Sequence, residues 1–465
     1  MEKNLILSEI ITQNKHWEND SSFFEHQKHQ RRLFLELVKY ISERQILSIV
    51  GLRRTGKTII LKQLINHLIV SKGVNSHNIL FLSFDEALIT SKITLKNYLD
   101  AFLKDIFRGK STEDVYIFLD EIQYIDKWQH ILKRYYDTNQ KIKFVVSGSS
   151  SLFLKKKTTE SLAGRIYEFR LEPLNFEEFL ELSDVPETLL ADYRKYSISS
   201  GELTVPYDQK EYDFFLANKG NTLRGLFEEY LLYYQFPEMV LQKDIHKVRK
   251  YISESIYKKT IEYDIPRLFG VEKIDELKFL FQLLVNENGS IIEFKTISSE
   301  AGIEENTLKK YISYFQESFL VDVLYNYSKS FRKSKRLQKK GYIASTNFFT
   351  AFRTDWMKND ILKSEYFGVL VETYVFNLLK KKYRYVSFYR KGKEELDFIA
   401  SNDYRNTSEC SLIEVKYTNT IKWNDIKFAD RISKKIFKTK YLVYSKNEFK
   451  IDEHKCIIPC FLIRA

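Results

Sequence analysis

The feature that most constrains this chain is the octapeptide at residues 51–58, which reads Gly-Leu-Arg-Arg-Thr-Gly-Lys-Thr. It fits the pattern G-x-x-x-x-G-K-[S/T], in which small residues let successive backbone N–H groups wrap a phosphate. A β-branched apolar run precedes it at residues 45–50, and helical spacing follows at residues 59–70. A strand, this loop and a helix that points its positive end at the anion form the order that phosphate binding requires.

The loop predicts ATP and Mg²⁺ as cofactors. Lys57 would reach the β- and γ-phosphates, and the hydroxyl of Thr58 would bind Mg²⁺. The residues of the loop that we expect to bind the nucleotide are Gly51, Arg54, Thr55, Gly56, Lys57 and Thr58.

Two further apolar runs end in polar residues. Residues 115–121 read Val-Tyr-Ile-Phe-Leu-Asp-Glu, so that Asp120 suits the outer-sphere Mg²⁺ role and Glu121 suits the base that polarises the attacking water. Residues 143–147 lead into Ser147-Gly148-Ser149-Ser150, where Ser147 could sense the γ-phosphate. The alternatives are a helix-capping Asp-Glu pair and a plain Ser/Gly turn. Buried strands separated by helices indicate a parallel α/β sheet, whose carboxyl edge would gather these residues.

The composition indicates which binding partners and which cellular compartment to expect. The formal net charge of +12 hints at a polyanionic partner, although a lysine-rich composition alone also raises the charge. Three cysteines without paired spacing argue against a disulfide framework and against a zinc site. The sequence shows no signal peptide and no apolar run long enough to span a bilayer, so we expect a cytoplasmic protein without a membrane partner.

Four motifs together resemble a known family. They are the Arg53-Arg54 pair inside the loop, Leu-Asp-Glu-Ile-Gln at residues 119–123 with Trp128, the Ser-Gly-Ser-Ser segment, and Leu-Ala-Gly-Arg at residues 162–165. The chain resembles the prokaryotic AAA-type ATPases that carry a C-terminal DUF4143 region, over about residues 25 to 445. Residues 230–238 resemble the family's Y-L-x-x-G-G-F-P-E, but Tyr234 and Gln235 replace the paired glycines, so the turn must be built differently.

The resemblance implies an AAA-like core at residues 1–172 with a helical lid or linker at residues 173–268. It makes Arg165 the candidate arginine finger or sensor, which would stabilise charge on the γ-phosphate. If Arg165 acts on a neighbouring subunit, the active form is a homo-oligomer. The alternative is an ordinary surface ion pair.

Residues 269–345 have the order of a winged helix-turn-helix. Helical patterns at residues 274–285, 294–301 and 304–317 precede a strand at residues 320–327. The segment at residues 328–340 carries basic and no acidic residues, and could lie along a phosphate backbone: Lys329, Arg332, Lys333, Lys335, Arg336, Lys339 and Lys340. We expect DNA as the partner. The alternatives are a protein-binding winged helix and a solvated charged face.

Residues 346–465 resemble the core of the PD-(D/E)xK nucleases, a small α/β restriction-endonuclease-like fold. Asp397, Glu414 and Lys416 would form its central triad, with Glu372 as a helical acid. Asp397 and Glu414 would share one Mg²⁺, and Lys416 would position the attacking hydroxide. D…ExK also occurs by chance in charged α/β domains, and the fold persists in proteins without activity.

The sequence therefore predicts an α/β protein. It would consist of a P-loop AAA-like parallel sheet with a helical lid, then a winged helix and a nuclease-like domain. The function that fits best is an ATPase that engages DNA and cleaves it. The alternatives are an ATP-driven regulatory switch or protein-binding module with an inactive nuclease fold, and a remodeller with a polypeptide substrate.

Overall fold

The computed structural model describes residues 2–18, 21–24, 29–84, 94–107, 114–149, 162–203, 205–404 and 409–464. The chain divides into two compact units. The first comprises residues 1–172 with 317–319, and the second comprises residues 173–316 with 320–465. Each unit contains its own sheet and its own covering helices.

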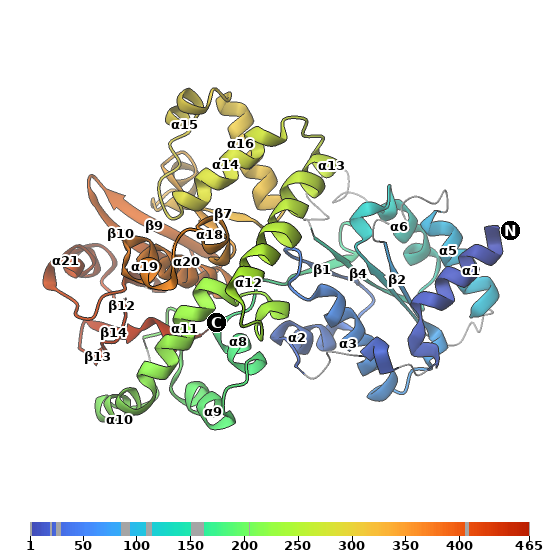
Figure 1. Ribbon diagram of the computed structural model, residues 1–465, viewed down its shortest axis with the longest axis horizontal. Helices are drawn as coiled ribbons and strands as arrows, with labels where there is room; N and C mark the ends of the chain where they lie inside the picture. Colours follow the sequence, from blue (N-terminus) through green and yellow to red (C-terminus); the bar gives the residue numbers. More distant parts are fainter. Residues whose placement is uncertain are drawn as a thin grey trace. The chain divides into compact units, whose positions relative to one another are not determined.

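The described strands of the first unit form a parallel sheet in the order β2-β3-β4-β1-β5 (Figure 1). The strands are β1 (Ile46–Val50), β2 (Ile79–Ser83), β3 (Val115–Asp120), β4 (Ile142–Gly148) and β5 (Ile166–Arg170). β1 and β4 are buried along their whole length, as expected for central strands of a sheet covered on both faces. The parallel α/β sheet predicted from the sequence is confirmed.

Helices cover both faces of this sheet (Figure 1). α2 (Arg32–Tyr40) and α3 (Lys57–Val70) lie on one face, and α1 (Glu2–Gln13), α5 (Leu95–Ala101) and α6 (Trp128–Thr138) lie on the other. Leu61 and Leu64 of α3 share one apolar core with Leu47 and Ile49 of β1. This packing fixes the helix that begins at Lys57 directly behind the loop at residues 51–56.

Side chains close the free edge of β2. The Asn14 amide donates to Phe81 O at 2.9 Å and accepts from Phe81 N at 2.7 Å, as a neighbouring strand would. Ser83 N donates to Gln13 Oε1 at 2.7 Å. An edge strand with open backbone groups is a template for pairing with other chains. The segment that follows α1 therefore protects the edge of the nucleotide-binding sheet.

His16 is buried beside this edge. Its Nε2 lies 3.2 Å from Ile79 O, and a carbonyl oxygen only accepts, so Nε2 carries the proton. Its Nδ1 is buried without a hydrogen-bond partner in the part of the chain that the structure describes. Protonation would add a second, unpartnered N–H, and burial accordingly lowers the pKa of His16 to about 4.

This geometry predicts acid sensitivity of the first unit. The folded pKa lies below the ordinary value of 6.5, so the unfolded chain binds more protons between these values, and stability is lost as the pH falls below 6.5. From about pH 7 to about pH 5 the wild type should lose about 2 kcal/mol more stability than His16→Gln. Hydrogen exchange of the β2 amides, corrected for intrinsic rates, measures the difference. Equal losses in the two proteins would contradict it.

The described strands of the second unit form an eight-stranded sheet in the order β13-β14-β12-β11-β10-β9-β7-β8, with a separate short pair of β15 and β6. β11 pairs antiparallel with β10 and parallel with β12. The strands are β6 (Ile198–Ser199), β7 (Val321–Asn326), β8 (Lys339–Ile343), β9 (Tyr385–Lys391), β10 (Glu394–Ser401), β11 (Ser411–Lys416), β12 (Tyr441–Ser445), β13 (Lys450–Ile451), β14 (Lys455–Pro459) and β15 (Ile463–Arg464).

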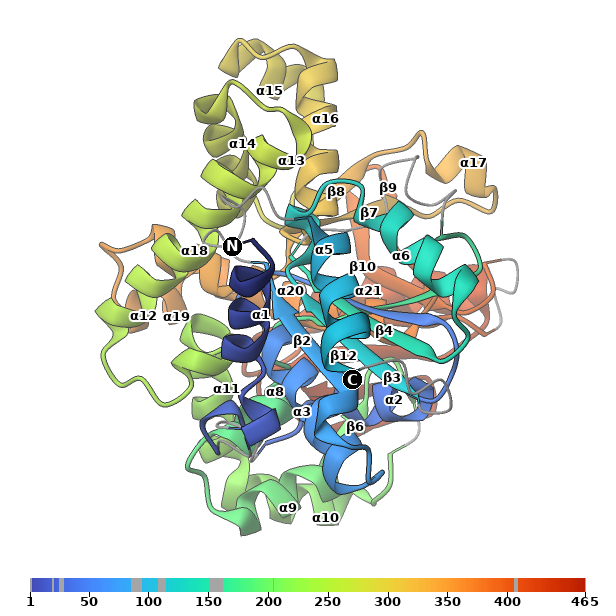
Figure 2. The same ribbon diagram turned by 90° about the vertical axis from the view of Figure 1, so that its right-hand side faces the viewer.

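The helices of the second unit fall into two sets. One set precedes β7, and its members α14, α15 and α16 form a group of their own (Figure 2). The set that precedes β7 includes α8 (Phe176–Leu182), α9 (Glu187–Tyr196), α10 (Gln209–Phe215), α11 (Asn221–Tyr233), α12 (Ile245–Tyr251), the π-helical segment η8 (Ile252–Asp264), α13 (Ile265–Phe269), α14 (Ile274–Asn286), α15 (Phe294–Ala301) and α16 (Glu305–Glu317).

The second set accompanies the sheet: α17 (Phe331–Ser334), α18 (Asn347–Phe352), α19 (Lys358–Lys363), α20 (Glu365–Lys382) and α21 (Trp423–Ile432). α20 packs Phe376 against Tyr342 of β8 and Phe398 of β10. No helix in the described part of the chain combines the length and the apolar composition that a bilayer crossing requires.

The β7–β8 hairpin pairs with a strand that we did not predict as its neighbour. We predicted it as the wing of a separate region at residues 269–345, but β7 also pairs in parallel with β9, where Tyr325 lies opposite Ser387. The hairpin thus belongs to the same sheet as the strands of the predicted nuclease-like domain. Pairing between strands far apart in sequence leaves no local pattern, so residue periodicity could not show it. The helices before it lie where the pattern placed them, and the winged-helix interpretation stays a prediction.

Gln235 explains how the turn after α11 is built without paired glycines. Its backbone O accepts from Leu174 N at 2.9 Å. Its side-chain Oε1 accepts from Ser345 Oγ at 2.7 Å and from Thr346 N at 2.9 Å. A buried amide therefore ties the turn to the segment before α18, which glycine could not do.

Candidate nucleotide-binding site and a second acidic site

The loop between β1 and α3 has the backbone geometry of a phosphate cradle. Gly56 has a φ of +98°, and a Cβ at Gly51 would lie 2.2 Å from Leu171 O, so only glycine fits there. The N-cap residue of α3 is Gly56, which has no side chain to cap the helix, so the N–H groups of its first turn can bind an anion. The loop is anchored from outside, because Arg31 donates to Thr55 O and to Glu172 O, both at 2.9 Å.

Lys57 lies along this loop. Its ammonium donates to Gly51 O and to Leu52 O, both at 3.1 Å, and its side chain is buried. Two carbonyl oxygens are partners that phosphate oxygens can replace without moving the helix. The predicted position of Lys57 in the site is therefore consistent with phosphate binding.

The carboxylate of Asp120 joins three elements. Thr58 Oγ1 at the start of α3 donates to Asp120 Oδ2 at 2.6 Å, and Ser147 Oγ at the end of β4 donates to Asp120 Oδ1. Glu121 N in turn donates to Ser147 Oγ at 3.3 Å. Asp120 is only 2% exposed. Burial, reinforced by Glu121, raises the pKa of Asp120, and the hydrogen bonds from Ser147 and Thr58 oppose that rise.

This donor set fits Mg²⁺. A hydroxyl and a carboxylate are hard oxygen ligands of the kind that Mg²⁺ takes beside phosphate and water. Thr58 and Asp120 would hold the ion, and Ser147 keeps the carboxylate oriented. The structure thus brings together the three strand ends that the sequence assigned to ATP chemistry, although Ser150 lies outside the described residues.

Gln123 is a site residue for which no role was predicted from the sequence. Its Nε2 donates to Glu121 Oε2 and to Ser149 Oγ, the latter at 3.0 Å. Glu121 itself has a left-handed backbone with a φ of 52°, a conformation that costs a non-glycine residue about 1 to 3 kcal/mol. The predicted base is therefore held at both its backbone and its carboxylate. The available signal was its place at the end of the Leu-Asp-Glu-Ile-Gln motif at residues 119–123.

Arg165 lies at the start of β5 in an ion pair with Asp137 of α6. The Nε and Nη2 atoms lie 2.9 and 3.3 Å from the two carboxylate oxygens. This is the surface ion pair that the sequence left as the alternative. The predicted action of Arg165 on a γ-phosphate stays a prediction.

A second acidic site lies where β10 and β11 run side by side. Val415 N donates to Asp397 Oδ2 at 2.7 Å, and Lys416 Nζ lies 2.6 Å from Glu414 Oε1. Glu414 Oε2 is buried and has no hydrogen-bond partner among the described residues. Burial, reinforced by Asp397, raises the pKa of Glu414. The structure therefore brings the predicted triad together and leaves one carboxylate oxygen without a partner.

Glu372 of α20 joins this site through residues of β8 that the sequence did not place there. It accepts from Tyr342 OH at 2.5 Å, and Lys340 Nζ lies 3.5 Å from its Oε1. Lys340 also forms an ion pair with Glu395 of β10. Burial raises the pKa of Glu372 to about 6, while the neighbouring Lys340 opposes the shift.

The acidic site has the donors of a cation site but not a complete ligand set. Asp397 and Glu414 offer carboxylate oxygens, which suit Mg²⁺. Within the described ranges, no group of three or more His, Cys, Asp or Glu side chains is arranged to hold a metal ion. The unpartnered Glu414 Oε2 nevertheless fits a cation, because a buried carboxylate oxygen otherwise lacks compensation for its lost hydration.

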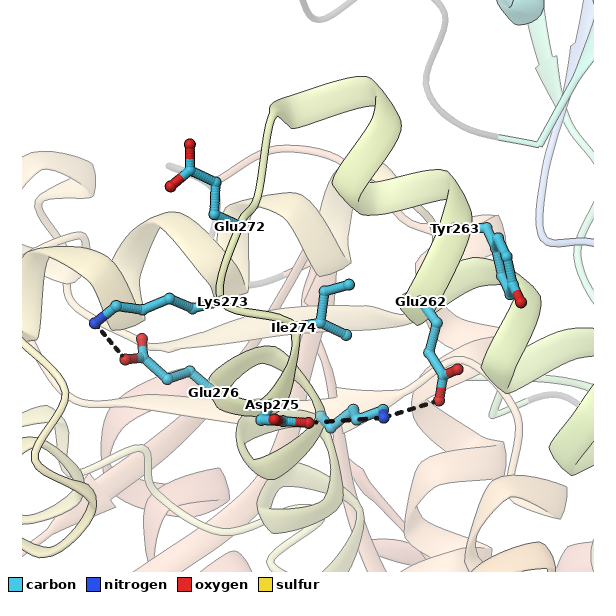
Figure 3. A pocket seen from close by; sticks show the side chains of 8 residues that line it. Glu262, Tyr263, Glu272, Lys273, Ile274, Asp275 and Glu276 are labelled. Atoms are coloured by element: carbon cyan, nitrogen blue, oxygen red, sulfur yellow. Dashed lines mark hydrogen bonds and ion pairs between the residues drawn. The ribbon is translucent and has the colours of Figure 1, made fainter.

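Other charged surfaces of the second unit differ from these sites. The hollow between η8 and α14 pairs its own charges, since Lys273 lies 2.7 Å from Glu276 and Lys278 lies 3.1 Å from Glu262 (Figure 3). The connection between β7 and β8, in contrast, exposes a run of cations: Arg332, Lys333, Lys335 and Arg336. Lys340 of the same basic run is buried.

Comparison with known families agrees with the motifs. An AAA domain model matches residues 43–180, and a model described as a domain of unknown function, DUF4143, matches residues 367–463. Between them, a second domain of unknown function, DUF8612, matches residues 224–353.

Curated relatives extend over most of the chain. An uncharacterized protein of Methanocaldococcus jannaschii is 25% identical over 75% of this chain and 78% of its own length. An uncharacterized protein of Haemophilus influenzae is 23% identical over 82% of this chain and 85% of its own length. Among solved structures, Cdc6p from Pyrobaculum aerophilum overlaps with 72% of this chain and 97% of its own at 14% identity, but with a TM-score of 0.27. That overlap is too weak to bear on function.

Proposed function

Because this chain belongs to the prokaryotic AAA-type P-loop ATPases with a C-terminal DUF4143 region, we propose that it binds and hydrolyses ATP at the Asp120 site. The observation that carries this proposal is the hydrogen-bonded set of Thr58, Asp120 and Ser147 beside the loop. A passive phosphate-binding loop needs no carboxylate at that place. A hydrolytic site needs one to hold Mg²⁺ and a second to act as base.

Each residue has a role that its contacts support. Lys57 would exchange the Gly51 and Leu52 carbonyls for phosphate oxygens. Bound Mg²⁺ would supply charge neutralisation on the phosphates. Glu121 would take the proton of the attacking water, and Gln123 would keep that carboxylate oriented. Arg165 would act on the γ-phosphate of a neighbouring subunit in a homo-oligomer, where its partly exposed guanidinium exchanges Asp137 for phosphate.

Two substitutions separate binding from turnover. Lys57→Ala should weaken ATP binding at least about tenfold, because it removes the charged donor to the phosphates. Glu121→Gln should bind ATP as the wild type does and lose about 100-fold or more in kcat, because an amide cannot accept the proton. Calorimetric ATP binding and phosphate release measure the two effects.

Lys72 is exposed just beyond the C-terminus of α3, so Lys72→Ala is the matched control. It should leave both the ATP affinity and kcat unchanged. Full hydrolysis by Glu121→Gln would show that another residue is the base.

A second candidate function follows from the acidic site of the second unit. We propose that Asp397 and Glu414 hold a divalent cation and that Lys416 positions a water for cleavage of a phosphodiester. The observation that favours it is the buried, unpartnered Glu414 Oε2 next to Asp397. DNA is the proposed substrate, because the exposed cations of the β7–β8 connection suit a phosphate backbone.

DNA cleavage tests this candidate. With Mg²⁺ or Mn²⁺ the wild type should cut plasmid or linear DNA, and Asp397→Ala and Lys416→Ala should not, because each loses part of the cation or water site. Lys427→Ala, exposed on α21, is the matched control and should cut like the wild type. Gel shifts at rising salt report on the binding step, and phosphate contacts predict a steep fall in affinity.

The other outcomes of the same experiment identify the alternatives. Salt-dependent binding without cleavage under any metal or nucleotide condition rules out the nuclease and favours an ATP-driven switch with an inactive nuclease fold. Absence of a gel shift at low salt favours a protein-binding module or a remodeller with a polypeptide substrate.

A further inference from the structure

Lys340 is a charged side chain in an unusual place. It belongs to β8, is 5% exposed, and lies between two carboxylates, those of Glu372 and Glu395. A buried ammonium is tolerated only where its charge is compensated. Its neighbour Tyr342 donates to the same oxygen of Glu372 at 2.5 Å. Two residues of the hairpin thus hold the carboxylate that α20 presents to the sheet.

The acidic site is therefore divided into two halves. In one half, Glu372 and Glu395 are neutralised by Lys340, with Arg390 at 3.7 Å from Glu395. In the other half, Asp397 is held by a backbone N–H, and Glu414 keeps one buried oxygen without a partner. The halves lie within electrostatic reach of each other, because Glu372 interacts with both Asp397 and Glu414.

A divalent cation at Asp397 and Glu414 would need further oxygen ligands, and Glu372 is the neighbouring carboxylate that could contribute. Lys340 opposes this in two ways. It engages Glu372 directly, and its positive charge repels a second cation in a buried environment, where charges are weakly screened.

We propose that Lys340 is a built-in competitor cation that holds Glu372 and weakens divalent-cation binding at Asp397 and Glu414. The proposal rests on the cation site suggested above for the second unit and is independent of ATP hydrolysis. The proposal also gives β8 a role in that site. This strand follows the exposed basic connection and carries Lys340, which weakens cation binding there.

The test is Mn²⁺ binding to the full-length protein without nucleotide, measured by calorimetry and by the electron paramagnetic resonance of free Mn²⁺. Lys340→Met should bind Mn²⁺ about tenfold or more tightly than the wild type, because one repelling unit charge is removed. Lys340→Arg keeps the charge and should bind like the wild type. The gain should disappear when Lys340→Met is combined with Asp397→Asn.

Lys340→Met removes the ammonium partner of two part-buried carboxylates and can destabilise the fold. The double variant Lys340→Met with Glu395→Gln preserves the net charge of the cluster and leaves Glu372 free to bind, so it should keep the part of the gain that comes from releasing Glu372 and bind Mn²⁺ more tightly than the wild type but less tightly than Lys340→Met. Wild-type affinity in this folded variant overturns the role of Lys340 while the cation site stands. A gain that survives Asp397→Asn also overturns it. Absence of Mn²⁺ binding in all variants overturns the cation site and the Lys340 proposal together.

Discussion

The nucleotide site depends on the hydrogen bonds that hold the buried carboxylate of Asp120. A carboxylate that is almost fully removed from water is costly unless hydrogen bonds compensate for its lost hydration. Here Thr58 and Ser147 supply them from α3 and β4. The parallel sheet makes this possible, because the carboxyl ends of β1, β3 and β4 meet at one edge. The loop, the base and the candidate γ-phosphate sensor are therefore positioned around one charge.

The second unit also contains carboxylates removed from water, but different donors compensate their charge. Its carboxylates are compensated mainly by ammonium groups, those of Lys416 and Lys340, together with a backbone N–H and the hydroxyl of Tyr342. Charges held by opposite charges resist a further cation, whereas a carboxylate held by neutral hydroxyls still attracts one. This contrast separates the site that suits Mg²⁺ with ATP from the one in which Lys340 already occupies part of the acid cluster.

Local sequence patterns predicted what depends on neighbours along the chain. The loop, the strands around it and the meeting of Asp120 with Ser147 followed from periodicity and from the geometry of parallel strands. Contacts between distant segments were not predictable, such as Asn14 on the edge of β2 or the pairing of β7 with β9. Individual side-chain contacts were not predictable either, because residue periodicity does not show that Gln123 donates to Glu121 or that Lys340 is buried.

The role of the Asp120 carboxylate is tested most directly by the Mg²⁺ dependence of ATP binding in Asp120→Asn. The substitution keeps the shape of the side chain and removes the charge that Thr58 and Ser147 hold. The wild type should bind ATP more tightly with Mg²⁺ than with a chelator, and Asp120→Asn should lose this difference together with hydrolysis. If Asp120→Asn retains both the Mg²⁺ dependence and the turnover of the wild type, the buried carboxylate is not the centre of the site.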